Sequence, residues 1–406
     1  MKLIYLHQYF KFPHESGGTR SYDLAKSFVK HGYEVEIITS TSENKYKKYK
    51  GWFTVKEDGL TVHYIFVPYD NTLSYMQRIV AFFKFMFLST KKLLKIKADV
   101  VLATSTPLTI AVPALVNKRF KKVPFIFEVR DVWPEAPIAI GAVRNKWMQK
   151  ALYWFEKKVY SRADAIISLS TDMEKSIITR YPTLKNKNIA VIENISEVNR
   201  FQQKNNSEKS FLRENNIPQN CFYVLYAGTF GKVNGLDYAV FLAKQTLEID
   251  PKIIYLLVGS GREKDEIIEN AQTKGVLNTN LFVLNSVSKA ELPQLYSEVD
   301  MGSSFVINIK ELWANSANKF FDTLAAGKPI LINHEGWQKE VITKDNVGYA
   351  LPPILNKDAI VDFVNYTQNK DLQTIQQENA LKKASNSYSL EVATQKYISV
   401  LEKIVS

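Results

Sequence analysis

The sequence is poor in the residues that build disulfides and metal sites. It has one cysteine, Cys221, and five histidines in 406 residues. A single cysteine excludes an internal disulfide and a cysteine-rich metal site, and it favours a reducing compartment. No apolar run reaches the ~18 residues that a membrane-spanning helix needs. The N-terminal MKLIYLHQYF lacks a small-residue cleavage site, so we interpret it as a buried strand and not as a signal peptide.

Acidic residues are fewer than basic ones, 41 against 53, which gives a formal net charge of +12 and a pI near 9.3. This balance favours an anionic partner such as nucleic acid, a phosphorylated small molecule or anionic lipid. Two lysine clusters lie within residues 45–50 and 84–97, and a solvated surface would explain them equally well. Because no nucleic-acid-binding module is recognisable, we expect no nucleic-acid partner.

The length exceeds what one hydrophobic core usually organises, so we expect two domains. Short apolar runs alternate with helical patterns, which predicts parallel β-α-β units and doubly wound α/β sheets. A first series of strands is expected at 3–6, 35–39, 99–103, 123–129, 165–169 and 189–192. A second series is expected at 222–227, 253–258, 281–284, 301–304 and 329–332.

The polar stretch 201–216 separates the two series. We therefore predict two Rossmann-like domains that face each other across a cleft, over residues 1–197 and 198–387. A helix at about 388–406 is expected to pack back on the first domain. Ligands of this architecture bind at the carboxyl ends of the strands, where helix N-termini present free N–H groups.

Glycines mark three loops that follow predicted strands, and glycines let backbone amides approach an anion closely. Each loop could also be only a tight turn, and the glycines do not complete a dinucleotide-binding fingerprint. We expect donor contacts from these loops: Gly17, Gly18, Gly228, Thr229, Lys232, Asn234, Gly259 and Arg262.

The segment NSANKFFDTLAAGKP, residues 315–329, is the densest candidate for a site. A helix is predicted from near Ser316 to Gly327. A lysine and free amides at a helix N-terminus suit a diphosphate, and an acid one turn further suits two vicinal hydroxyls. The alternative is the polar start of an ordinary surface helix. The candidates are Asn315, Ser316, Asn318, Lys319 and Asp322.

These segments resemble glycosyltransferase family 4, and the similarity extends over essentially the whole chain. The subgroup that the chain resembles most is the amino-deoxysugar (fucosamine-type) transferases of surface-polysaccharide assembly. The family's first β-α-β unit is similar to SGGTRSYDLAKSFVKHGYEVEIIT, and its "RD-aromatic-PE" segment to EVRDVWPEAPIAIG. The interdomain segment is similar to VIENISEVNRF, and the donor-domain motifs to YAGTFGKVNGLD and NSANKFFDTLAAGKPI.

The resemblance implies a GT-B fold with the donor in the second domain, a UDP-linked sugar as that donor, and transfer with retention. It implies no metal and no other cofactor. Asp322 matches the ribose-binding acid of the family's Glu-x7-Glu motif, but Ala314 stands in the place of the first Glu.

The family's glycine loop carries an Arg and a Lys where this chain has Thr229 and Asn234. The charge that neutralises the diphosphate must therefore come from elsewhere. Lys319 is expected to supply it as a catalytic residue, with Lys232 and Arg262 as alternatives.

In the first domain, Arg130 and Asp131 follow the strand at 123–129 and are expected to be catalytic, because the family often has a His in the place of Arg130. A structural ion pair is the alternative. Arg20 and Glu135 are expected to contact the acceptor, although a helix start after Pro134 would explain Glu135 as well.

The segment 73–94 is apolar on all sides of a predicted helix and ends in a basic stretch. Such a helix is either fully buried or inserted in something apolar. The run Phe82–Phe87, with Lys91 and Lys92 after it, fits shallow insertion into an anionic membrane surface. In that interpretation Phe83 and Phe85 are the membrane contacts, while core packing or dimerisation is the alternative.

Together these features predict a cytoplasmic enzyme, peripheral on the inner face of the membrane. It would move a sugar, in particular an N-acetylated amino sugar, to a polyprenyl-diphosphate-linked glycan acceptor. The alternative is a nucleotide-sugar epimerase or hydrolase of the same fold, which would use Asp131, His7 and Glu135 near the sugar.

Overall fold

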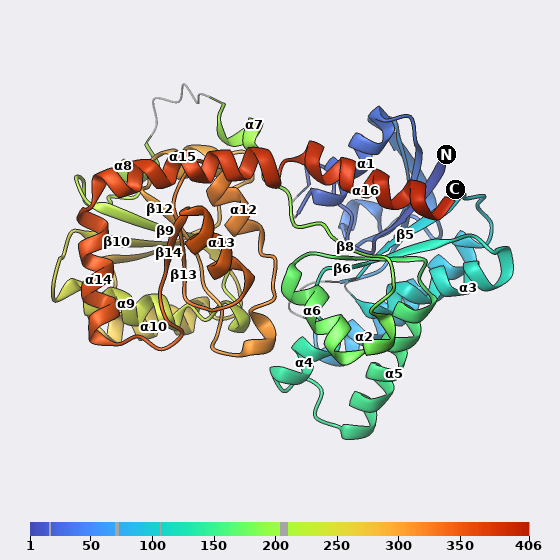
Figure 1. The fold of residues 1–406 in the computed structure, drawn as a ribbon, viewed down its shortest axis with the longest axis horizontal. Helices are drawn as coiled ribbons and strands as arrows, with labels where there is room; N and C mark the ends of the chain where they lie inside the picture. The colour runs from blue at the N-terminus through green and yellow to red at the C-terminus, as the bar shows by residue number, and fades with distance from the viewer. Residues whose placement is uncertain (16–17, 70–72, 106, 204–209, 406) are drawn as a thin grey trace. The chain divides into compact units, whose positions relative to one another are not determined.

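The computed structural model describes residues 1–15, 18–69, 73–105, 107–203 and 210–405. The chain forms two compact units (Figure 1): unit 1 is residues 1–193 with 390–406, and unit 2 is residues 194–389. These boundaries differ from the expected 197 and 388 by a few residues. Ser196 and Ser389 pair in an isolated parallel bridge, so the chain enters and leaves unit 2 at neighbouring points.

Unit 1 contains an eight-stranded sheet in the order β3-β4-β2-β1-β5-β6-β7-β8. All of its neighbouring strands are parallel except β3 and β4. Its parallel strands are continuous apolar runs because helices cover both faces. The strands are β1 (Lys2–Leu6), β2 (Glu34–Thr41), β3 (Phe53–Glu57), β4 (Leu60–Phe66), β5 (Val100–Thr104), β6 (Phe125–Val129), β7 (Ala165–Ser168) and β8 (Ile189–Val191).

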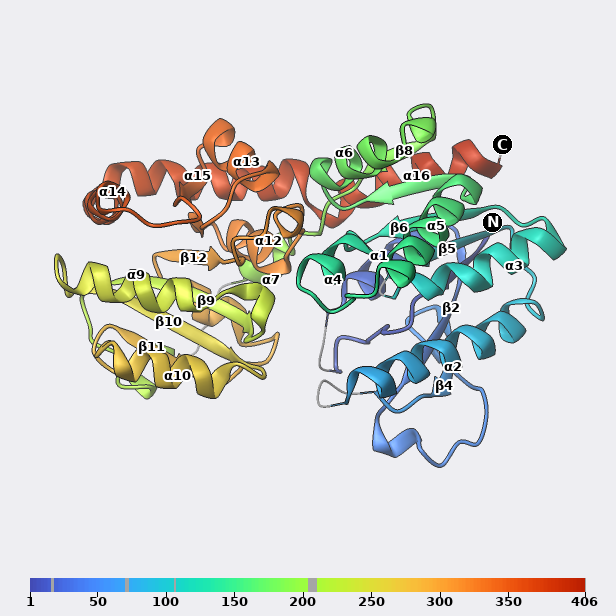
Figure 2. The same ribbon diagram turned by 90° about the horizontal axis from the view of Figure 1, so that it is seen from below.

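The helices of unit 1 lie on the two faces of this sheet. On one face, α2 packs against α3 and α3 against α5, and Figure 2 shows these three side by side. On the other, α1 packs against α16. The bounds are α1 (Arg20–Lys30), α2 (Tyr75–Leu93), α3 (Ala111–Lys121), α4 (Glu135–Ala139), α5 (Lys146–Arg162), α6 (Thr171–Arg180) and α16 (Leu390–Val405), with 3-10 helices η1 (Asn44–Tyr46), η2 (Leu108–Ile110) and η3 (Pro182–Leu184).

Unit 2 contains a six-stranded, fully parallel sheet in the order β11-β10-β9-β12-β13-β14. Its strands are β9 (Phe222–Thr229), β10 (Ile253–Ser260), β11 (Leu281–Leu284), β12 (Met301–Ser304), β13 (Ile330–Ile332) and β14 (Gly348–Ala350). Its helices are α7 (Val198–Phe201), α8 (Phe211–Glu214), α9 (Asp237–Leu247), α10 (Lys264–Thr273), α11 (Leu292–Ser297), α12 (Asn318–Ala325), α13 (Trp337–Asp345), α14 (Lys357–Gln368) and α15 (Lys370–Ser387), with η4 (Lys232–Asn234) and η5 (Lys310–Leu312). The predicted α/β class with two doubly wound sheets is confirmed.

The helix α2 is neither fully buried nor wholly exposed. Phe85 is 1% exposed and belongs to the core of unit 1, whereas Phe83 and Phe87 are more than half exposed. The choice of Phe85 as a membrane contact was therefore wrong, because it lies on the side of the helix that faces the sheet. Among the described residues, every helix is too short or too polar to cross a bilayer.

Candidate functional site

The central feature of unit 2 is Lys319, on the first turn of α12, beside the end of β9. Its Nζ lies 3.0 Å from Asn234 Oδ1 and 4.8 Å from the centre of the Tyr226 ring. Gly228 makes room for it, because a Cβ at that position would lie 3.1 Å from Lys319 Cε. The fold thus brings the start of α12 next to the loop after β9, which lies almost ninety residues earlier in the chain. This is expected for segments at the carboxyl edge of one parallel sheet.

Asn234 holds Lys319 in place from the glycine loop. While its Oδ1 accepts from the ammonium, its Nδ2 donates to the carbonyl of Thr229 at 2.9 Å. The Tyr226 hydroxyl donates to the same carbonyl at 2.7 Å. The Asn that replaces the family's Lys therefore positions a lysine that comes from another element.

No carboxylate of the described residues lies within ion-pair distance of Lys319. Burial lowers the pKa of its ammonium to about 8, so it is still largely charged at neutral pH. A half-buried cation that has an amide but no carboxylate as its partner is suited to bind an external anion.

The start of α12 adds free donors next to this cation. Ala317 occupies the N-cap position and cannot cap the helix with its side chain. Asn194 Nδ2 holds the loop by donating to the Ser316 carbonyl and, at 2.9 Å, to Asn318 Oδ1. Within the described part of the chain, Ser316 Oγ and Asn315 Oδ1 are buried without a hydrogen-bond partner. Buried polar atoms of this kind are normally satisfied, so a ligand is the expected partner.

Asp322 lies one turn further along α12. Burial, with the negative charge of Glu197 as a second cause, raises the pKa of its carboxyl to about 7. Glu197 is itself paired with Lys289 and, at 2.7 Å, with Arg200. Sequence reasoning missed this group, although Glu197 and Arg200 stand in the segment that resembles the family's interdomain motif.

The second glycine loop of unit 2 has a packing role. A Cβ at Gly259 would lie 1.9 Å from the Gly228 carbonyl oxygen, and one at Gly261 would lie 2.1 Å from that of Phe230. These glycines let β10 and its loop approach β9. Lys232 and Arg262 are both exposed, whereas Lys319 is half-buried. Their expected donor contacts, with those of Gly259, stay predictions.

In unit 1, Arg130 and His7 meet at the ends of β6 and β1. The Arg130 amide donates to Ser105 Oγ at 2.8 Å, and its guanidinium lies 3.4 Å from His7 Nε2. Burial, with the charge of Arg130, lowers the pKa of His7 to about 3, so His7 is neutral and accepts from Arg130. Asp131, next in the chain, is exposed.

Arg20 points into the core of unit 1. It is 6% exposed, pairs with Glu128 and donates to the Tyr397 hydroxyl at 3.0 Å. Tyr397 in turn donates to Glu128. Although burial alone would raise it, the charges of Arg20 and Arg130 lower the pKa of Glu128 to about 2. The expected acceptor residue thus fastens α16 to the sheet.

The remaining candidates of unit 1 have structural neighbours of their own. Glu135 pairs with Arg180 and accepts from Ser176 Oγ at 2.9 Å. Thr19, which follows the glycine pair and precedes α1, donates its hydroxyl to Asp23 at 2.9 Å and makes no side-chain cap of the helix. Gly18 is exposed, and Gly17 lies outside the described residues.

Comparison with known proteins identifies what these two units resemble. A family model for a glycosyl transferase 4-like domain matches residues 17–194, and one for glycosyl transferases group 1 matches residues 207–385. The glycosyl transferase WcaI of Escherichia coli K12, named for colanic acid biosynthesis, is 22% identical over 333 residues, which cover 78% of this chain and 79% of WcaI.

Solved structures with this fold include two that extend over nearly the whole chain. Sucrose-phosphate synthase from Thermosynechococcus elongatus superposes with a TM-score of 0.78 at 13% identity, covering 99% of this chain and 98% of the other. Anabaena HepE, solved in complex with UDP-glucose, superposes with a TM-score of 0.71 at 15% identity, covering 99% and 100%.

Proposed function

The chain belongs to the GT-B glycosyltransferases, and we propose that it moves a sugar from a UDP-linked donor, bound by unit 2, to a lipid-linked glycan. Its use of a nucleotide sugar and its relation to polysaccharide biosynthesis follow from the family and from WcaI. The nucleobase, an N-acetylated amino sugar as the transferred group, retention at the anomeric carbon and the lipid carrier belong to the proposal.

The observation that carries the proposal is the cation Lys319, held by Asn234 beside the uncapped start of α12. A diphosphate brings two anionic groups, which this ammonium and the first amides of the helix could bind together. Asp322, one turn on, is then spaced to accept hydrogen bonds from the two ribose hydroxyls. A bound UDP moiety would therefore contact the Lys319 ammonium, the first amides of α12 and the Asp322 carboxylate at the same time.

The reaction follows from the same arrangement. As the bond between the anomeric carbon and the β-phosphate oxygen breaks, negative charge develops on the departing phosphate. Lys319 and the helix amides stabilise that charge, and a preorganised donor of this kind contributes about 3 kcal/mol. The acceptor oxygen forms the new bond on the same face of the sugar, and its proton passes to the departing phosphate. No protein nucleophile is needed.

The acceptor side of the proposal is assigned to unit 1. Arg130, supported by His7 and Ser105, offers a fixed cation at the ends of β6 and β1. The acceptor is a sugar on polyprenyl diphosphate, which places the enzyme on the inner face of the cytoplasmic membrane as a peripheral protein.

The test is transfer from a panel of radiolabelled nucleotide sugars, with and without polyprenyl-diphosphate-linked acceptors. We expect label in the lipid fraction with a UDP-sugar, and the same yield in excess chelator. Label that stays in the aqueous phase as free sugar would point to a hydrolase instead. Transfer that is lost in chelator and restored by Mg²⁺ would contradict the metal-independent mechanism.

A further inference from the structure

The helical layer formed by α2, α3 and α5 has an unusual charge. These three helices contain twelve Lys or Arg residues and one acid, Glu156. Glu156 is fully buried and paired with Arg180 at 3.0 Å. The exposed charged side chains of these helices are therefore all basic, and Lys118 is paired with Asp164 at 2.6 Å. The twelve basic residues less Glu156 leave a net charge of +11 on the three helices, against +12 for the whole chain.

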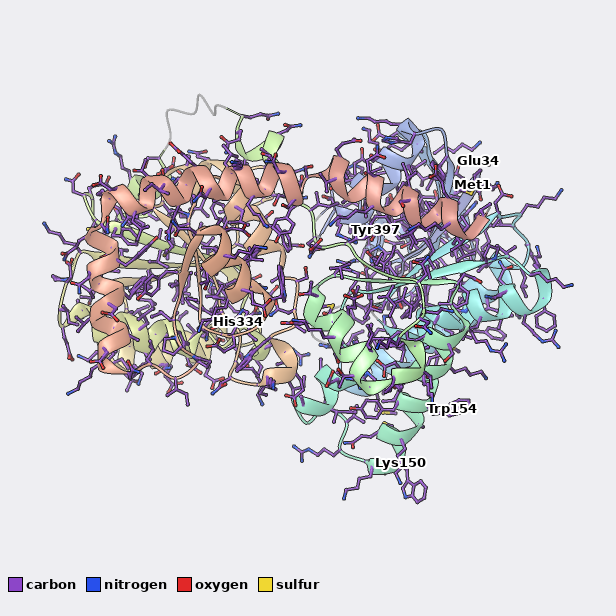
Figure 3. The ribbon with its side chains drawn as sticks, in the orientation of Figure 1. Met1, Glu34, Lys150, Trp154, His334 and Tyr397 are labelled. Carbon is purple, nitrogen blue, oxygen red and sulfur yellow. The ribbon has the colours of Figure 1, made fainter. Side chains whose placement is uncertain are left out.

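The outer side of α5 also presents two tryptophans. Trp147 is 80% and Trp154 is 62% exposed, and seven residues place them on the same side of a helix. Lys150 and Lys158 lie on this side too, with Nζ 5.3 Å from the Trp147 ring and 5.0 Å from the Trp154 ring. Figure 3 shows Lys150 and Trp154 pointing away from the body of unit 1.

The outer side of α2 has the same composition. Met76, Val80, Phe83 and Phe87 are all more than half exposed, and their spacing of four, three and four residues makes one stripe along the helix. Lys91 Nζ lies 4.3 Å from the Phe87 ring at the end of that stripe. Two helices of one helical layer, with α3 packed between them, thus each combine exposed apolar side chains with lysine.

The chemistry of this surface selects one kind of partner. Lysine is depleted at protein–protein interfaces. A nucleic-acid backbone is bound mainly through its phosphates, with which exposed Phe, Met and Val side chains make no favourable contact. Tryptophan is enriched where water meets a bilayer, and lysines beside it attract anionic headgroups. Lysine stems can also lie along apolar surface while their ammonium groups stay in water.

We propose that the basic-aromatic face, the exposed sides of α2 and α5 with Phe83, Phe87, Trp147, Trp154, Lys150 and Lys158, docks on an anionic bilayer. The aromatic rings enter the headgroup region and the lysines bind lipid phosphates. This docking rests on the proposed function in one respect, since a lipid-linked acceptor gives it a purpose. It is otherwise a property of unit 1 alone.

The first measurement is co-sedimentation of the full chain with vesicles. We expect binding to vesicles that contain phosphatidylglycerol, weakened by salt, and little binding to pure phosphatidylcholine. Equal binding to both vesicles, or none to either, would overturn the proposal.

Two variants with matched controls in unit 2 locate the surface. Lys150→Glu with Lys158→Glu should weaken binding by about thirtyfold or more, because each basic residue near an anionic surface is worth about fivefold. Lys357→Glu with Lys382→Glu, both exposed on α14 and α15, make the same change in net charge and should have a much smaller effect. Similar losses in the two pairs would show that only net charge matters and would overturn the assignment of the face.

The aromatic contribution is tested by Trp147→Ser with Trp154→Ser, against Phe241→Ser on α9, the exposed aromatic of unit 2. The tryptophan pair should lose about tenfold or more in vesicle binding, and the control should lose none. Unchanged binding would overturn the proposal, as would a change from dimer to monomer in sedimentation, which would mark the face as a contact between copies.

UDP binding by calorimetry separates this proposal from the previous one. The face variants should bind UDP like the original chain, because every substitution lies in unit 1. Lost docking with retained UDP binding and retained transfer to a detergent-solubilised lipid acceptor supports the assignment of the face. Normal docking with no transfer to any lipid acceptor would leave the face standing and refute the proposed acceptor.

Discussion

The two units each hold a cation near the carboxyl ends of their strands, but with different partners. In unit 1, Arg20 is buried against Glu128, and Tyr397 completes the group. In unit 2, Lys319 has the neutral amide of Asn234 as its partner and is half-buried. Both residues were expected from the sequence to touch substrate, yet the structure gives them different surroundings.

The difference teaches how to separate a structural cation from a binding one. Taking a charge out of water is costly unless an opposite charge accompanies it. Arg20 has that charge within the protein and so contributes to the fold. Lys319 has no such charge beside it among the described residues, and burial lowers the pKa of its ammonium to about 8. The partner that we propose for it is the diphosphate of a bound donor.

The largest expected effect is on the stability of unit 1. Glu128→Gln keeps the shape of the side chain but leaves the Arg20 charge buried without compensation, which should lower the free energy of unfolding by about 3–5 kcal/mol. Glu135→Gln is the matched control, since its pair with Arg180 is partly exposed and should be worth about 1 kcal/mol or less. Denaturant titration followed by circular dichroism measures both. Equal midpoints for the two variants would contradict the structural role that we assign to the buried pair of Arg20 and Glu128.

Lys319→Ala should act on activity and not on the fold. Turnover should fall by roughly two orders of magnitude because a contact with the departing phosphate is lost, while the free energy of unfolding stays the same or rises. Lys232→Ala is the control and should stay near the original rate, because Lys232 lies in the glycine loop that contains Asn234 but is exposed. A near-normal Lys319→Ala together with an inactive Lys232→Ala or Arg262→Ala would show that the charge comes from another residue.

Asp322→Asn should have a smaller effect that falls on binding. Loss of a charged hydrogen bond to ribose should weaken UDP binding by about 1–3 kcal/mol, with little change in turnover at saturating donor. Calorimetry with UDP and with the 2′-deoxy analogue measures this. The original chain should discriminate against the analogue, and the variant should not.

The pH dependence of UDP binding should show both groups together. The Asp322 carboxyl has a raised pKa of about 7 and gains its charge as the pH rises through that value, whereas Lys319 loses its charge as the pH rises through about 8. Binding is therefore expected to be strongest between these values and to weaken by about fivefold from pH 7 to 6, as the ionised fraction of Asp322 falls. Asp322→Asn should remove the acid limb of the profile and Lys319→Ala the alkaline limb. A flat profile would contradict both assignments.

The sequence predicted the central strands well because parallel strands covered on both faces are uninterrupted apolar runs. It missed β3 and β4 at the edge of unit 1. The pair Asp58-Gly59 between them is a sequence signal for a hairpin turn, and both residues have the positive φ that such a turn requires. It also missed β14, which has only three residues. The exposed strand β3 and the short strand β14 leave too little apolar pattern to be recognised, whereas β4 is seven residues long and mostly buried.

The candidate site was predictable where neighbours in sequence form it. The helix α12 starts within two residues of the expected position, and Lys319 and Asp322 follow from it. The pairing of Lys319 with Asn234 was not predictable, since 85 residues separate them. The structural role of Arg20, which we expected to contact the acceptor, was not predictable either, because its carboxylate partner lies 108 residues away. A signal existed in Glu128 itself, an acid in the middle of the apolar run FIFEV.

The helix α16 follows unit 2 in the chain, and is therefore synthesised after it, but belongs to unit 1. A ribosome that adds about 5–20 residues per second needs roughly 10–40 s for the residues of unit 2. Throughout that time the first unit is present without Tyr397, so the buried pair of Arg20 and Glu128 lacks its third member. The surface of α1 that α16 covers is exposed to solvent for the same period. Synthesis order and assembly order therefore differ in this chain, and truncation before Tyr397 would leave unit 1, the unit made first, as the one that cannot be completed.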